Sequence, residues 1–160
     1  MSINMSKTRK AQFIFTMMLS TVFLSSDFIL SPTIDGLYKA FPESGAAVNF
    51  IVSGASILSL FFAPLVSKIM TKCGTKLIYN IGSAIIAASC LLFELIMNPI
   101  WMCAMRVLYT IGYECVMIGS VAILRQAYTD EKKLGNIMGF YYAAMGLIGM
   151  LTGLLAAAIA

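Results

Sequence analysis

Five long apolar stretches, separated by short segments that carry charge, make up almost the whole chain. The stretch between Lys10 and Asp35 contains a single charged residue, Asp27, and the stretch from Leu134 to Ala160 contains none. A helix needs about 20 apolar residues to cross the roughly 30 Å hydrocarbon core of a bilayer. The pattern therefore predicts one membrane domain over residues 1–160, without a soluble domain. Its five transmembrane helices are expected at about 11–34, 45–69, 76–97, 99–125 and 135–160.

The composition agrees with an all-α membrane protein. Hydrophobic residues make up 60% of the 160 residues and charged residues 11%, whereas a soluble domain has about 25% charged residues. These values exclude a soluble enzyme and a nucleic-acid-binding module. The chain has no histidine, which is the commonest metal ligand and general base. Its four cysteines lack metal-binding or redox spacing. We therefore expect no enzyme activity, no metal and no cofactor.

Basic residues gather on one side of the predicted membrane domain, in the N-terminal tail and in alternate connecting segments. Nine of the eleven lie in the N-terminal tail and in the segments after the second and fourth stretches: Lys7, Arg9, Lys10, Lys68, Lys72, Lys76, Arg125, Lys132 and Lys133. Loops rich in lysine and arginine stay in the cytoplasm. We therefore predict a multi-pass protein of the cell (inner) membrane with a cytoplasmic N-terminus and an external C-terminus. A cleaved signal peptide is the alternative for the first stretch, although no small-residue cleavage site follows Val22-Phe23-Leu24.

Three charged residues lie well inside the predicted spans, whereas Glu94 lies at the outer end of the third helix. Asp27 lies seven residues before the outer end of the first helix, and Arg106 lies seven residues after the outer start of the fourth. At 1.5 Å per residue both are about 10 Å deep, so they form either an ion pair or two walls of one cavity. Glu114 lies about 12 Å deeper than Arg106. Ionisable residues at this depth usually face protein or water, because exposure to lipid is costly.

Polar residues extend this pattern along two helices. Thr110 stands between Arg106 and Glu114 at steps of four, with Tyr109 and Tyr113 beside it, so these residues share one helical face. On the first helix a second stripe contains Thr16, Ser20, Asp27 and Ser31. Two such stripes favour the lining of a water-filled cavity, with a buried ion pair that only joins helices as the alternative. Pro32 either frees a backbone carbonyl toward this cavity or marks the end of the helix.

Small residues form one continuous face of the predicted fifth helix. They recur at steps of three and four: Gly135, Gly139, Ala143, Gly146, Gly149, Gly153 and Ala157. Small residues let helix backbones approach closely in lipid. The face therefore predicts a helix–helix contact rather than a ligand site.

These features together resemble the N-terminal half of a major facilitator superfamily transporter, most like the bacterial drug-efflux and sugar-efflux permeases. The segment between the second and third helices is similar to the family's loop motif at Lys72, Gly74 and Lys76, whereas Thr71 stands where the motif has an acid. Arg106 with Gly112 is similar to the family's fourth-helix motif. The small-residue face of the fifth helix resembles the antiporter motif, although Leu154 replaces its proline.

The resemblance implies five helices of a six-helix half, and hence a truncated or fragmentary transporter that is inactive alone. It implies proton-coupled efflux of a small molecule or drug by alternating access, with Asp27 as the protonatable site and Glu114 contacting the substrate. The expected partners are the lipid bilayer, the substrate, protons, and either a separate C-terminal half or a second copy. The alternative is a membrane component that does not itself transport, such as a partner subunit.

Overall fold

The computed structural model describes residues 17–18, 20–22, 24–30, 32–93, 95–128 and 130–159. Its elements are the short 3-10 helix η1 (Ser26–Ile29) and the α-helices α2 (Ile34–Ala40), α3 (Gly45–Cys73), α4 (Thr75–Phe93), α5 (Pro99–Ala127) and α6 (Glu131–Ile159). The described residues before η1 are helical. No strand occurs in this part of the chain, which confirms the all-α fold class. The tail residues Lys7, Arg9 and Lys10 lie outside the described residues, as do Thr16 and Ser31.

Four of the described helices, α3 to α6, are long and apolar enough to cross a membrane. They occupy the regions in which the last four spans were predicted. Two of the helix starts have a local cause. The Asn98 side chain accepts hydrogen bonds from the backbone N–H groups of Ile100 and Trp101 at the start of α5, and Asp130 does the same for Lys132 and Lys133 in α6. These are N-caps.

The first predicted span differs from a single helix over 11–34. Its described part tightens into η1 around Asp27, and a separate helix, α2, follows in the segment expected to be a loop. Pro32 cannot donate a backbone hydrogen bond, and the Thr33 hydroxyl bonds to the Leu30 carbonyl. The Ser25 carbonyl accepts a hydrogen bond from the Thr152 hydroxyl of α6. The break in the helix is therefore supported by side chains on both sides.

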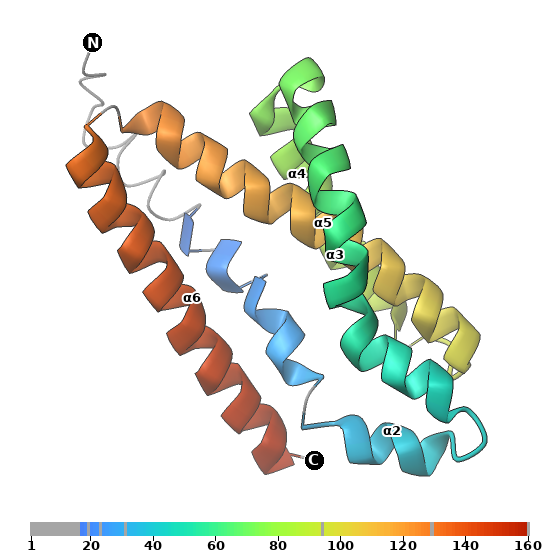
Figure 1. The fold of residues 1–160 in the computed structure, drawn as a ribbon. Helices are drawn as coiled ribbons and strands as arrows, with labels where there is room; N and C mark the ends of the chain where they lie inside the picture. The colour runs from blue at the N-terminus through green and yellow to red at the C-terminus, as the bar shows by residue number, and fades with distance from the viewer. Residues whose placement is uncertain are drawn as a thin grey trace.

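The helix α5 is the centre of the bundle, because it contacts α3, α4 and α6. Figure 1 shows α5 crossing behind α3, with α4 beside them, while α6 runs along the N-terminal segment that contains η1. Half of the most apolar stretch of α5 is buried, whereas only 6% of that of α6 is buried. The fold therefore presents α5 as the shared wall between two groups of helices.

Two glycines bring α4 and α5 into backbone contact. A Cβ atom added at Gly112 would lie 2.9 Å from the Gly82 carbonyl oxygen and 2.9 Å from Ile86 Cγ1, and one added at Gly82 would collide with Cys115 Cβ. Close approach of this kind requires small residues in membrane helices. The central helix pair thus depends on Gly82 and Gly112 rather than on the small-residue face of α6.

Gly112→Ala should lower the free energy of unfolding by about 1–3 kcal/mol, because overpacking a close contact displaces backbone. Gly146→Ala is the matched control, since a Cβ atom there meets nothing within 4 Å. The measurement is unfolding of the purified protein in mixed detergent micelles, followed by circular dichroism. Equal effects of the two substitutions would contradict the close crossing of α4 and α5.

Candidate functional site

Asp27 and Arg106 form an ion pair between η1 and α5. Arg106 Nη2 lies 2.5 Å from Asp27 Oδ1. The pair brings together two residues that are 79 positions apart in the sequence, as their equal depth predicted. The ion pair expected as one of two arrangements is therefore present, and each of its members also lines a cavity.

The two members of the pair differ in exposure. The Arg106 side chain is 3% exposed and the Asp27 side chain 38%. The guanidinium carbon of Arg106 also lies 5.1 Å from the centre of the Tyr109 ring, a cation–π distance. Within the described residues, Arg106 Nε has no hydrogen-bond partner. Arg106 therefore relies on one carboxylate and one aromatic ring to balance a buried charge.

A small cavity of about 140 Å³ adjoins the carboxylate of Asp27. We name it the hydroxyl cavity, because it is lined by Asp27, Ala55, Ser56, Ser59, Tyr109, Thr110 and Tyr113. The Thr110 hydroxyl donates to the Arg106 carbonyl over 2.8 Å, which leaves its oxygen free to accept. A polar cavity of this size can hold water. The cavity thus has room for water beside the Asp27 carboxylate.

A larger cavity of about 650 Å³ lies on the other side of the pair. We name it the apolar cavity, because methionine and other apolar side chains dominate its lining: Leu30, Thr33, Leu37, Ser89, Cys90, Phe93, Met97, Met102, Met105, Arg106 and Tyr109. A mostly apolar cavity with few polar groups is typical of small-molecule sites. Asp27 lines the hydroxyl cavity, Arg106 lines the apolar cavity and Tyr109 lines both, so the ion pair stands at their boundary.

Of the residues expected at the site, Tyr109, Thr110 and Tyr113 lie with Asp27 in the hydroxyl cavity, but Glu114 does not. The rings of Tyr109 and Tyr113 are 6.2 Å apart. Glu114 is 7% exposed, and within the described residues no basic side chain pairs with it. It is therefore a buried carboxylate of α5 that has no counter-charge among the described residues.

Ser56 and Ser59 of α3 are site residues that the sequence analysis missed. They line the hydroxyl cavity opposite α5. With Ser53 they recur at steps of three on an otherwise apolar helix, and this spacing places them near one helical face. That periodicity was the available signal. No charged residue lies near these serines on α3, and the candidate site residues were selected around charged ones.

The polar stripe of the first helix is divided in the structure. The Ser20 hydroxyl lies 3.2 Å from the Tyr141 hydroxyl of α6, so it joins two helices. Asp27 alone of its described members lines a cavity. The Phe28 ring packs against Gly149, where a Cβ atom would lie 2.6 Å from it. The segment around Asp27 is thus held between α5 and α6.

The small-residue face of α6 has two different environments. Gly149 is buried against Phe28, and a Cβ atom at Gly153 would lie 3.6 Å from the Phe28 carbonyl oxygen. Gly139 and Gly146 meet nothing within 4 Å. Only the second half of the face therefore packs against another described segment.

The loop motif lies at the opposite end of the bundle from α2. Gly74 ends α3 with φ +91°, a conformation that residues with a side chain rarely adopt. Lys72 is in the last turn of α3 and Lys76 in the first turn of α4. The glycine makes the tight connection between the two helices, and both lysines are exposed beside it.

A family model described as Major Facilitator Superfamily matches residues 13–160 of the chain. The match includes every described element, both members of the ion pair and the loop motif. Comparison with curated proteins and comparison with solved structures gave no match.

Proposed function

The chain belongs to the major facilitator superfamily, a family of membrane transporters, and we propose that it serves proton-coupled efflux of a small molecule by alternating access. In this family's mechanism, helical bundles move against each other around a central site. The observation that carries the proposal is the ion pair of Asp27 and Arg106, which stands between a hydroxyl-lined and an apolar cavity. No chemical change of the substrate is part of it.

In the proposed mechanism Asp27 takes up and releases the transported proton. While the pair is closed, Arg106 stabilises the ionised carboxylate. Protonation of Asp27 removes the attraction and leaves the buried guanidinium facing the Tyr109 ring. The ion pair can then open, and η1 can move relative to α5 together with the helical residues that precede it. The exposure of Asp27 to the hydroxyl cavity supports it as the member that exchanges protons.

Glu114 is the proposed contact for a cationic or polar substrate. It is a buried carboxylate on the same helix as Arg106, and no basic side chain among the described residues pairs with it. A positively charged group on the substrate would supply the missing counter-charge. Glu114 does not line the two cavities beside the ion pair. The proposal therefore requires the substrate to reach Glu114 by a path other than these two cavities.

We orient the protein with its N-terminus in the cytoplasm of the cell and its C-terminus outside, in a cell (inner) membrane. The α3–α4 and α5–α6 connections then lie inside, where their lysines and arginines are favoured. The described helices form one wall of a transport path, and α6 is largely exposed. We propose that a separate C-terminal half or a second copy supplies the opposing wall, and that the chain alone does not transport.

The test is reconstitution of the purified chain into vesicles with an imposed proton gradient and a panel of cationic dyes and sugars. We expect dye binding to the chain but no gradient-driven flux, because a single wall cannot close both entrances. Strong flux that Asp27→Asn abolishes would contradict inactivity while supporting the role of Asp27. Neither flux nor binding of any compound would favour the alternative, a membrane component that does not itself transport.

A further inference from the structure

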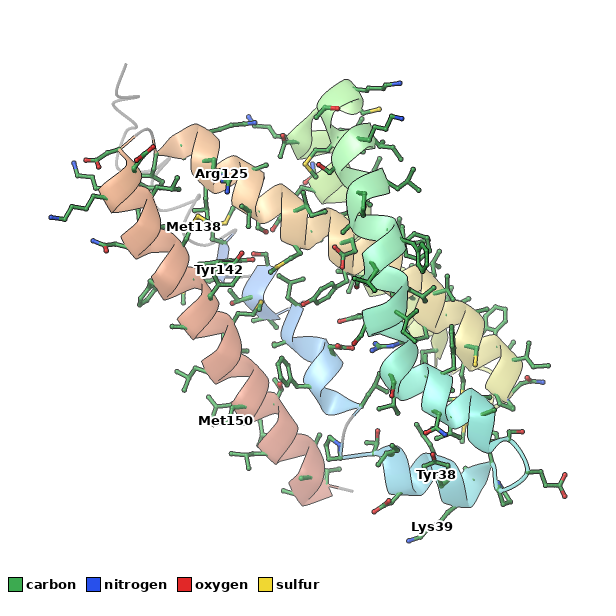
Figure 2. The ribbon with its side chains drawn as sticks, viewed as in Figure 1. Tyr38, Lys39, Arg125, Met138, Tyr142 and Met150 are labelled. Carbon is green, nitrogen blue, oxygen red and sulfur yellow. The ribbon has the colours of Figure 1, made fainter. Side chains whose placement is uncertain are left out.

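A third cavity, larger than the two beside the ion pair, has no role in the transport proposal. Its volume is about 1060 Å³, and it opens at the connection between α3 and α4. We name it the basic-end cavity, because its polar lining includes Lys76 of α4 and Arg125 of α5. Figure 2 labels Arg125 and Tyr142, which line the cavity from α5 and α6. It lies toward the opposite end of α5 from the apolar cavity.

The basic-end cavity carries uncompensated positive charge. No acidic side chain contributes to its lining, and within the described residues neither Lys76 nor Arg125 forms an ion pair. The first turn of α4 contains no acidic residue, so its backbone N–H groups add a partial positive charge at the cavity. The Gln126 side chain bonds to the Thr75 hydroxyl over 3.2 Å, which ties this helix start to the end of α5.

Much of the rest of the lining is apolar, beside the hydroxyl groups of Ser67 and Thr71. Met117, Ile118 and Val121 of α5 form a wall that runs from the charged end toward the middle of the membrane span. A free inorganic anion would gain nothing from contact with such an apolar wall, whereas the acyl chains of a lipid can pack along it. Basic pockets between membrane helices bind acidic headgroups in this way. The combination of a cationic end and an apolar wall selects an amphiphile.

We propose that the basic-end cavity binds an anionic phospholipid, with its phosphate between Lys76 and Arg125 and its chains along α5. The lipid would bridge the ends of α3, α4 and α5 at the membrane surface. The proposal is independent of which small molecule is transported and of whether Asp27 carries protons.

The experiment is native mass spectrometry of the full chain released from micelles that contain equal amounts of phosphatidylglycerol and phosphatidylcholine. The measured quantity is the ratio of the two lipids retained. We expect phosphatidylglycerol to be favoured about thirty-fold, the effect of two basic residues near a membrane surface. Lys76→Gln with Arg125→Gln should bring the ratio close to one. Lys132→Gln with Lys133→Gln is the matched control and should leave the preference unchanged.

Three results would overturn the proposal. They are a ratio near one in the unsubstituted chain, an equal loss in both double variants, and displacement of the lipid by inorganic phosphate or an acidic peptide at equal concentration. Equal losses would show a general surface charge effect, and displacement would assign the cavity to another anion. Should the first double variant fail to fold, Lys76→Gln and Arg125→Gln singly must each reduce the ratio by about fivefold.

Discussion

Asp27→Asn should lower the free energy of unfolding by about 3–5 kcal/mol, the cost of leaving a buried charge without its partner. The orphaned group is Arg106, whose side chain is 3% exposed. Arg106→Gln should cost less, because it leaves Asp27, whose side chain is 38% exposed and can be hydrated from the hydroxyl cavity. The asymmetry is the specific expectation, since a simple surface pair would show small and equal effects.

The measurement is a double-mutant cycle on purified protein, with unfolding in mixed micelles as the readout. The double variant Asp27→Asn/Arg106→Gln should recover much of the stability, because it removes the unpaired charge together with its partner. Asp35→Asn is the matched control, because Asp35 is exposed and the same chemical change there should stay within about 0.5 kcal/mol. A coupling free energy near zero between Asp27 and Arg106 would show that the two side chains do not form a stabilising ion pair.

Much of this arrangement could be predicted from the sequence, because a membrane imposes simple constraints. The length of an apolar stretch fixes whether a helix can cross, and depth along a helix fixes which charges can meet. Asp27 and Arg106 were therefore matched by counting residues from two helix ends. The helical spacing of Tyr109, Thr110 and Tyr113 placed these residues on one face of α5, and that face lines the hydroxyl cavity.

The features that were not predicted depend on contacts between distant segments. The 3-10 turn around Asp27 is supported by Phe28 against Gly149 and by Thr152 against the Ser25 carbonyl. Gly149 belongs to the predicted small-residue face, but nothing in the sequence identifies Phe28 as its partner, and the Thr152 contact has no periodic signal. Glycines in a membrane helix do not show by themselves whether another helix packs against them. Gly82 and Gly112 form the close crossing of α4 and α5, whereas a Cβ atom at Gly139 or Gly146 would meet nothing within 4 Å. Composition shows where a backbone could approach, and only the fold shows which helix does.

The opposite case is Glu114, which the sequence placed on the polar face and the structure leaves outside both cavities beside the ion pair. Steps of four residues drift around a helix that turns every 3.6 residues. Glu114 is two such steps beyond Arg106, so it lies about 12 Å farther along α5 and is turned by about 80° around the helix, while staying buried. This separation of the two carboxylates by position suggests that they can be separated by function as well.

Asp27→Asn and Glu114→Gln should therefore alter binding of a cationic dye in different ways. In the unsubstituted chain, binding should weaken as the pH falls, because protonation of Asp27 opens the pair and changes the site. Asp27→Asn resembles the protonated state at every pH, so its binding should lose most of this pH dependence. Glu114→Gln should weaken binding about tenfold or more, as expected for loss of a charge-assisted contact, and should keep the pH dependence that Asp27 provides.

Equilibrium dye binding, measured by fluorescence anisotropy over a range of pH, separates these effects from loss of folding. A variant that is merely unstable would lose binding capacity at every pH without changing the shape of the profile. Asp35→Asn serves as the control for a carboxylate outside the site. An unchanged profile in Asp27→Asn would show that proton exchange resides elsewhere. A flat profile in Glu114→Gln would instead assign that role to Glu114.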